Sequence, residues 1–172
     1  MLYLALTSLL AGPAHALPAS LRQDIEDARA RSNPTLPVLQ TSPGDRKTDA
    51  GQVDGAGAVR FAVTRPMVAN LVDHARWLTL SDGRRVGQVR VLAPTAASLS
   101  LEFSEASLPM GASVWLDAMD GTDARRRPIT HQHADGGRLF TPLVRSDELL
   151  VTVALPPGAR TPILQLAAAH VG

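Results

Sequence analysis

The stretch Leu149–Leu155, LLVTVAL, decides the fold class together with Ser98–Phe103, SLSLEF. Large apolar residues occupy every second position in both stretches. Successive side chains of a β-strand point to opposite faces, so a period of two predicts strands with one buried face and one wet face. The pattern recurs more briefly in Gln88–Val91 and Ser113–Asp117. The sequence therefore predicts a protein built from short strands.

Turn signals separate the expected strands from one another. Asp82-Gly83 predicts a hairpin turn, because this pair tolerates positive φ angles, and Pro156-Pro157-Gly158 predicts another turn. Short strands at this spacing favour an all-β fold, an antiparallel β-sandwich of jelly-roll or immunoglobulin-like type. The expected strands are 59–65, 77–80, 86–92, 98–103, 113–118, 138–140, 149–155 and 163–168.

Residues 1–16 resemble a secretory signal peptide. An uncharged apolar run ends at Gly12-Pro13, and Ala14-His15-Ala16 supplies small residues for cleavage after Ala16. The run is far shorter than the roughly 20 residues that span a bilayer, so no membrane span is expected after signal removal. We expect a secreted or periplasmic protein. An apolar N-terminal strand or helix is the alternative.

The segment 17–58 is expected to be a short helix followed by a flexible extension. Leu21, Ile25 and Ala28 fall on one face of a helix over 17–31, and Ser20 is a candidate cap. Thr35–Gly57 is rich in turn formers and has no sustained period, which is typical of a linker. The sandwich domain is then 59–172.

Two segments are expected to be open to trypsin. The linker offers Arg46 and Lys47, and the polar loop Asp120–Gly136 offers Arg125 and Arg126. Cleavage in the linker would leave the sandwich whole.

Composition excludes some classes of function. The chain has 17 Lys and Arg against 16 Asp and Glu among 172 residues, and it has no cysteine. A net charge of +1 argues against nucleic-acid binding, which needs a basic face. Without disulfides, an exported domain depends on its core for stability.

His131, His133 and Asp135 are the candidate metal ligands. They recur at every second residue, so an extended segment would place them on one side, where they could bind zinc. The spacing resembles the His-x-His-x-Asp-His signature of metallo-β-lactamase-like hydrolases, but Gly136 stands in place of the last histidine. We therefore expect a polar loop without metal, and no cofactor.

No pattern predicts a catalytic site. Ser113 lacks the Gly-x-Ser-x-Gly context of a nucleophile, and Asp73-His74 have no nucleophile beside them. Asp147-Glu148 could be paired carboxylates, but a solvated turn is the simpler interpretation. The sequence therefore predicts that the protein is not an enzyme.

Two further residue groups could bind a partner. Trp77 and Trp115 could line a carbohydrate-binding face, although single tryptophans in a small sandwich usually belong to its core. Arg125-Arg126-Arg127 could bind an acidic partner, although such a run is commonly a solvated loop.

The region from Trp77 to Ala168 resembles the N-terminal, non-catalytic part of secreted bacterial trypsin-like serine peptidases of the lysyl endopeptidase type. The motifs that carry the resemblance are strand patterns and turns. They are Gly87–Val91, Ser98–Phe103, Leu108–Ala112, Leu139–Pro142 and Asp147–Pro156.

The resemblance implies an accessory module that acts on a trypsin-like serine peptidase domain. A pro-region of this kind would assist folding of the peptidase, hold it inactive, or both. No catalytic residue can be transferred, because the catalytic triad of that family belongs to a peptidase domain that we do not find in this sequence. We expect a truncated gene product, a fragment or a stand-alone protein. The alternative function is a stand-alone secreted binding module for carbohydrate or a cell-surface ligand.

Overall fold

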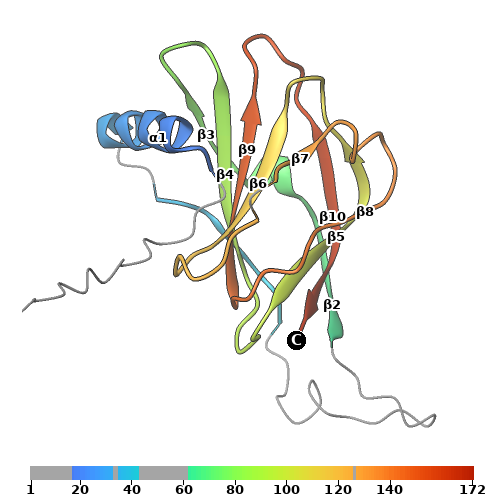
Figure 1. Ribbon diagram of the computed structural model, residues 1–172. Helices are drawn as coiled ribbons and strands as arrows, with labels where there is room; N and C mark the ends of the chain where they lie inside the picture. Colours follow the sequence, from blue (N-terminus) through green and yellow to red (C-terminus); the bar gives the residue numbers. More distant parts are fainter. Residues whose placement is uncertain (1–16, 33–34, 43–61, 126) are drawn as a thin grey trace, which may run out of the picture.

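The computed structural model describes residues 17–32, 35–42, 62–125 and 127–172. Two β-sheets pack face to face, and one helix, α1 (Ala19–Ser32), lies on the outer side of the larger sheet (Figure 1). The predicted all-β sandwich with a short N-terminal helix is confirmed. The proposed signal peptide, residues 1–16, lies outside the described residues.

The larger sheet has six strands in the order β1-β4-β9-β6-β7, with β3 also paired to β4. All pairs are antiparallel except β1 with β4. β3 and β1 pair with successive halves of β4, whose other side pairs with β9. The strands are β1 (Val38–Gln40), β3 (Arg76–Thr79), β4 (Arg85–Leu92), β6 (Ser113–Ala118), β7 (Ile129–Thr130) and β9 (Glu148–Leu155).

The smaller sheet has four antiparallel strands in the order β2-β10-β5-β8. They are β2 (Val63–Asn70), β5 (Leu99–Ser107), β8 (Leu139–Phe140) and β10 (Ile163–Val171). β10 forms hydrogen bonds along both edges, to β2 and to β5. Just after β10, Gly172 O accepts hydrogen bonds from the N–H groups of Ala97 and Ser98.

The core lies between the sheets and follows the predicted alternation. Leu99, Leu101 and Phe103 of β5 face the interior, as do Val151 and Val153 of β9. The expectation that the other face of β9 is wet is wrong. Thr152 and Ala154 are also buried, because β9 lies between two strands and α1 covers part of the outer face.

The N-terminal elements are joined to the sandwich. Leu21, Ile25 and Ala28 of α1 are buried together with Val86 and Ala154 of the larger sheet, which confirms the predicted apolar face of the helix. Ser20 lies inside the helix rather than before it, because α1 begins at Ala19. Part of the predicted linker is a strand: β1 pairs in parallel with β4. The remainder, from residue 43 to 57, lies outside the described residues.

The segment after residue 62 differs from the expectation. The strand predicted to close at Arg65-Pro66 continues through the proline to Asn70. Proline lacks an N–H, but β2 is the edge strand of its sheet, where this loss is tolerated. Leu71 and Val72 then form a short helix, α3 (Leu71–His74), and both enter the core.

The predicted polar loop between β6 and β7 is partly ordered by backbone bonds. Arg125 N–H bonds to Leu116 O, and Ala118 N–H bonds to Asp123 O. Asp123 Oδ2 accepts the backbone N–H of Arg145 at 2.9 Å, which ties this loop to the loop before β9. β7 occupies two residues of the same segment.

Limited trypsin digestion is expected to give first a stable fragment beginning near Thr48, which keeps every described strand except β1. Arg84, Arg85 and Arg90 should resist, because they lie in or beside the β3–β4 hairpin and their side chains are half-buried. Arg125 should be cut more slowly than the sequence alone suggests, because its N–H is bonded. Mass spectrometry of early time points tests this order. First cuts at Arg85 or Arg90 would contradict it.

Candidate functional site

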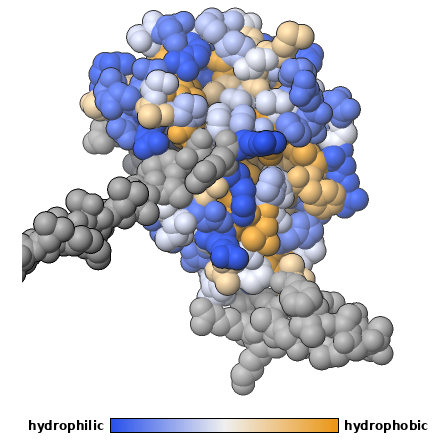
Figure 2. All heavy atoms as spheres, in the orientation of Figure 1, coloured by the Kyte–Doolittle hydropathy of each residue, from blue (hydrophilic) through white to orange (hydrophobic). Residues whose placement is uncertain are grey.

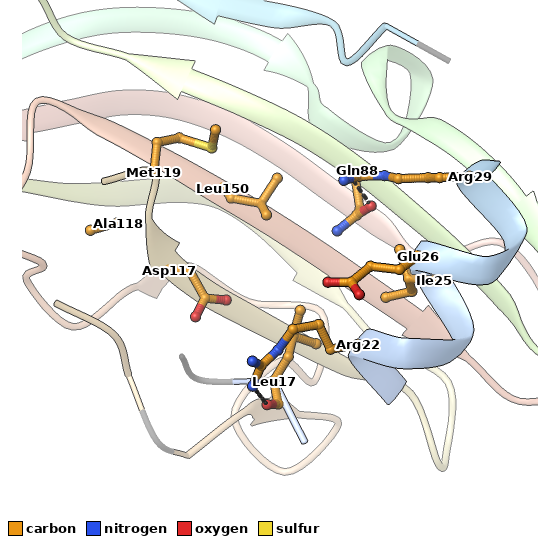
Figure 3. A pocket seen from close by; sticks show the side chains of 10 residues that line it. All are labelled: Leu17, Arg22, Ile25, Glu26, Arg29, Gln88, Asp117, Ala118, Met119 and Leu150. Carbon is orange, nitrogen blue, oxygen red and sulfur yellow. Dashed lines mark hydrogen bonds between the residues drawn. The ribbon is translucent and has the colours of Figure 1, made fainter. Parts of the chain in front are cut away.

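A groove runs between α1 and the outer face of the larger sheet (Figure 3). The groove is partly open to solvent and has a volume of about 170 Å³. α1 provides one wall, the sheet provides the floor, and the end of β6 provides the other wall (Figure 3). The lining residues are Leu17, Arg22, Ile25, Glu26, Arg29, Gln88, Asp117, Ala118, Met119 and Leu150.

A short polar chain links the helix to the sheet at one end of the groove. Arg29 Nη2 donates to Gln88 Oε1 at 2.6 Å, and Gln88 Nε2 donates to Thr152 Oγ1 at 2.9 Å. Burial lowers the pKa of Arg29, against the opposing influence of the Glu26 carboxylate. Gln88 and Thr152 are both buried, so their polar atoms depend on these hydrogen bonds in place of water.

At the other end of the groove, fewer of the polar groups form good hydrogen bonds. Arg22 Nη2 donates to Leu17 O at 3.4 Å, a long bond. The Nε atom of Arg22 is buried and has no acceptor among the described protein atoms, and the same is true of Arg29 Nε at the first end. The groove combines apolar walls with the guanidinium groups of Arg22 and Arg29 and the carboxylates of Glu26 and Asp117, so it offers both apolar and charged contacts to a ligand.

A second hollow, of about 290 Å³, lies along the other side of α1. It is flanked by Leu21 of the helix and by Trp115, Pro156 and Pro157 of the sheet side. Arg84, next to it, forms a 2.7 Å ion pair with Asp24 of α1. The helix thus has an unfilled space on each side.

A cluster of polar side chains crosses the outer face of the smaller sheet. His170 of β10 lies between Thr64 of β2, at 3.0 Å from Nδ1, and Glu102 of β5, at 2.9 Å from Nε2. Arg138, which precedes β8, donates from Nε to Glu102 Oε1 at 2.9 Å. Phe140 lies beside this network, with the Arg138 guanidinium 5.0 Å from its ring centroid.

The chemistry of this cluster favours a structural tie over catalysis. A hydroxyl, an imidazole and a carboxylate in line resemble a nucleophile, a base and an orienting group. Here, however, the carboxylate also accepts from Arg138, and Thr64 stands on an edge strand away from the hollows beside α1. Each of the four strands has a member in or next to the network, so the cluster joins the sheet across its width.

Stability is expected to fall in acid partly through Glu102. The bond from Arg138 and, second to it, the bond from His170 hold the pKa of Glu102 below its usual value, while burial opposes this. A carboxyl group whose pKa is lower in the folded state than in the unfolded state stabilises the fold. This contribution is complete at pH values above the unfolded-state pKa, and it is lost as the pH falls through the folded-state pKa.

Thermal unfolding of the wild type and Glu102→Gln across pH measures this contribution. The wild type should melt at a higher temperature at neutral pH, and the difference should shrink below pH ~4, near the usual glutamate pKa. The paired design is needed because Asp82, Asp120 and Asp123 also have lowered pKa values. A difference that is independent of pH would contradict the role of the Glu102 charge.

Comparison with protein families identifies the chain. The model of the lysyl endopeptidase N-terminal domain matches residues 30–172, which is nearly the whole of the chain. The chain belongs to this family. The family is an N-terminal domain and not the catalytic part of the peptidase. No curated protein and no solved structure matched the chain.

The lysyl endopeptidase N-terminal domain matched here includes all described strands. Of α1, the match includes only the last three residues. In the described part of this family member, no helix has the length and hydropathy of a membrane span.

The candidate metal ligands do not converge in this lysyl endopeptidase N-terminal domain. The segment is a turn rather than an extended strand: His133 Nδ1 accepts the Thr130 N–H at 3.1 Å, and Asp135 pairs with Ser107. Among the described residues, no three His, Cys, Asp or Glu side chains could together hold a metal ion. That the protein binds no metal stays a prediction, which elemental analysis would test.

The residues weighed for catalysis lie apart. Ser113 Oγ accepts from Trp115 Nε1 at 3.0 Å on β6, whereas Asp73 and His74 end α3. Glu148 begins β9 and forms an ion pair with Arg90 at 2.5 Å. These contacts give each group a structural partner or a separate location.

Both tryptophans are half-buried and use their N–H groups internally. Trp77 Nε1 donates to Val72 O at 3.1 Å, and the Arg85 guanidinium lies 5.7 Å from its ring centroid. Trp115 bonds to Ser113 and packs with the residues under α1. Neither ring stands out as the flat exposed platform that sugar stacking uses.

Sequence reasoning missed the cluster around Glu102 and the grooves beside α1. Thr64, Glu102, Arg138 and His170 have no common motif and are separated by tens of residues. Only the pairing of β2, β10, β5 and β8 brings them together. The available signal was that Glu102 is a charged residue between apolar residues of a strand, which predicts a position on the outer face.

Proposed function

We propose that this protein is a pro-region-like accessory module that acts on a secreted trypsin-like serine peptidase of the lysyl endopeptidase type. The observation that carries the proposal is the family match over residues 30–172. The module assists folding of the peptidase domain, holds it inactive, or does both. It has no hydrolytic activity of its own, and it acts outside the cytoplasm after removal of residues 1–16.

The mechanism is surface complementarity. A rigid sandwich presents two outer faces and several strand edges to a partner, and a stable complex buries about 800 Å² on each partner. The described surface carries large apolar side chains that such a contact could bury, among them Val68, Met110, Phe140 and Ile163. Figure 2 shows hydrophobic atoms gathered in the middle of the face it presents, between hydrophilic margins.

The decisive experiment adds the full chain in trans to a lysyl endopeptidase catalytic domain. We expect the module to raise the yield of active enzyme on refolding, to inhibit hydrolysis of a small lysyl ester, or both, saturably with its concentration. The module alone should cleave no lysyl or arginyl ester. No effect on either refolding or activity would overturn the proposal.

A matched variant separates inhibition from competition by a substrate. Lys47 is the only lysine of the sequence, and the other 16 basic residues are arginine. A lysine-specific enzyme therefore has a single lysyl bond to cleave in this chain. Lys47→Arg removes that bond without changing the charge, so the variant should inhibit as strongly as the wild type. Loss of inhibition in this variant would mean that the chain acts only as a substrate.

A further inference from the structure

The apolar contacts of α1 form a cluster of their own. Leu17, Leu21, Ile25 and Ala28 are buried on the outer side of the larger sheet, apart from the main core between the sheets. They cover a set of sheet-side residues that we call the outer-face patch. This patch consists of Leu78, Leu80, Val86, Trp115 and Ala154.

The fit between α1 and the outer-face patch is incomplete. Hollows of about 170 and 290 Å³ flank the helix on its two sides. Both hollows are open to solvent, so the edges of the helix are not covered by other parts of the described chain. The helix therefore buries its apolar face on the patch but leaves an open groove along each side.

An exposed ion pair and a partly buried hydrogen bond tie α1 to the sandwich. In the Asp24–Arg84 pair, the side chains are 40 % and 33 % exposed, and exposed ion pairs contribute little. Nearer the other end of the helix, Arg29 bonds to Gln88, which is buried and bonds in turn to Thr152. The exposed side of α1, at the upper left of Figure 2, is mostly hydrophilic, so the helix contributes no core beyond its one apolar face.

The family match distinguishes the helix from the surface that it covers. All residues of the outer-face patch lie within residues 30–172, whereas Leu21 and Ile25 of the helix lie outside that range. The patch thus belongs to the common domain, and the part of α1 that covers it does not.

We infer that the outer-face patch is a docking surface for an amphipathic helix, occupied here in cis by α1 and opened when α1 is displaced. The partner's helix presents apolar side chains at positions i, i+4 and i+7, as Leu21, Ile25 and Ala28 do. It carries a carboxylate at i+3, where Asp24 pairs with Arg84. This inference does not rest on the proposed function.

Fluorine NMR of the full chain labelled with 5-fluorotryptophan separates release of α1 from unfolding. Trp115 packs in the α1 cluster and Trp77 against the main core, so the two resonances report on different regions. Assignment uses Trp115→Phe and Trp77→Phe. With rising urea, the Trp115 resonance should change first, while Trp77 remains native. A change of both resonances at the same urea concentration would overturn the inference.

Ile25→Asp in the full chain opens the patch, and Ala30→Asp is the matched control at an exposed helix position. In Ile25→Asp, the Trp115 resonance should move to its released position while Trp77 stays native. Ala30→Asp should keep both resonances of the wild type. If Ile25→Asp also loses the native Trp77 resonance, α1 is an integral part of the fold and the inference fails.

A synthetic peptide of residues 17–31, added to the Ile25→Asp chain, tests docking in trans. It should restore the Trp115 resonance saturably. A peptide carrying Ile25→Asp should bind at least about tenfold more weakly, since burial of one large apolar side chain is lost. A peptide carrying Ala30→Asp should bind like the wild-type peptide. No restoration, or equal binding of all three peptides, would overturn the proposal.

Discussion

Phe103→Ala is expected to lower the free energy of unfolding by about 3–5 kcal/mol. Phe103 is 1 % exposed, and on β5 it lies opposite Leu166 of β10 and Leu139 of β8. Truncation removes the buried ring and leaves a cavity between the two sheets. Because small domains are stable by only about 5–15 kcal/mol, the variant should be marginal at room temperature.

Phe140→Ala is the matched control for this prediction. Phe140 is 53 % exposed and lies on the outer face of the same sheet. Its loss removes the contact with Arg138 and should cost about 1 kcal/mol or less. Urea unfolding followed by circular dichroism measures both variants. Equal losses would contradict the assignment of inner and outer faces.

Gly87→Val is expected to destabilise the protein by about 2–3 kcal/mol through overpacking. A Cβ at position 87 would lie 2.8 Å from two ring atoms of Trp77. The ring cannot move freely, because its N–H is bonded to Val72 O and it lies opposite Gly87 in the β3–β4 pair. The added side chain must therefore displace the ring or separate the strands.

Two further variants test this mechanism. In Gly137→Val, the new Cβ meets only Asp135 Oδ1 at 3.6 Å, an ordinary contact, so little stability should be lost. In the double variant Gly87→Val with Trp77→Leu, the smaller side chain makes room, so the two losses should not add. Fully additive losses, measured by urea unfolding, would show that the contact with Trp77 is not the cause.

The elements of the fold could largely be predicted from the sequence because their signals are local. The alternation in β5 and β9, the Asp82-Gly83 turn between β3 and β4, and the apolar face of α1 follow from neighbouring residues. β1 escaped prediction because three residues are too few to show a period, and its strand geometry comes from pairing with β4. β2 was cut short because Pro66 is a strand breaker except at an edge, and edges are defined only by the assembled sheet.

The sequence by itself determined the all-β class, most strands, the helix and the family resemblance, because periodicity, turns and motifs are properties of short segments. The tertiary structure alone decided which of these residues meet. It placed Gly87 against the Trp77 ring, gathered Thr64, Glu102 and His170 across the smaller sheet, and put α1 over the outer-face patch. The first depends on the register of the β3–β4 hairpin, and the other two depend on how elements far apart in the chain pair and pack.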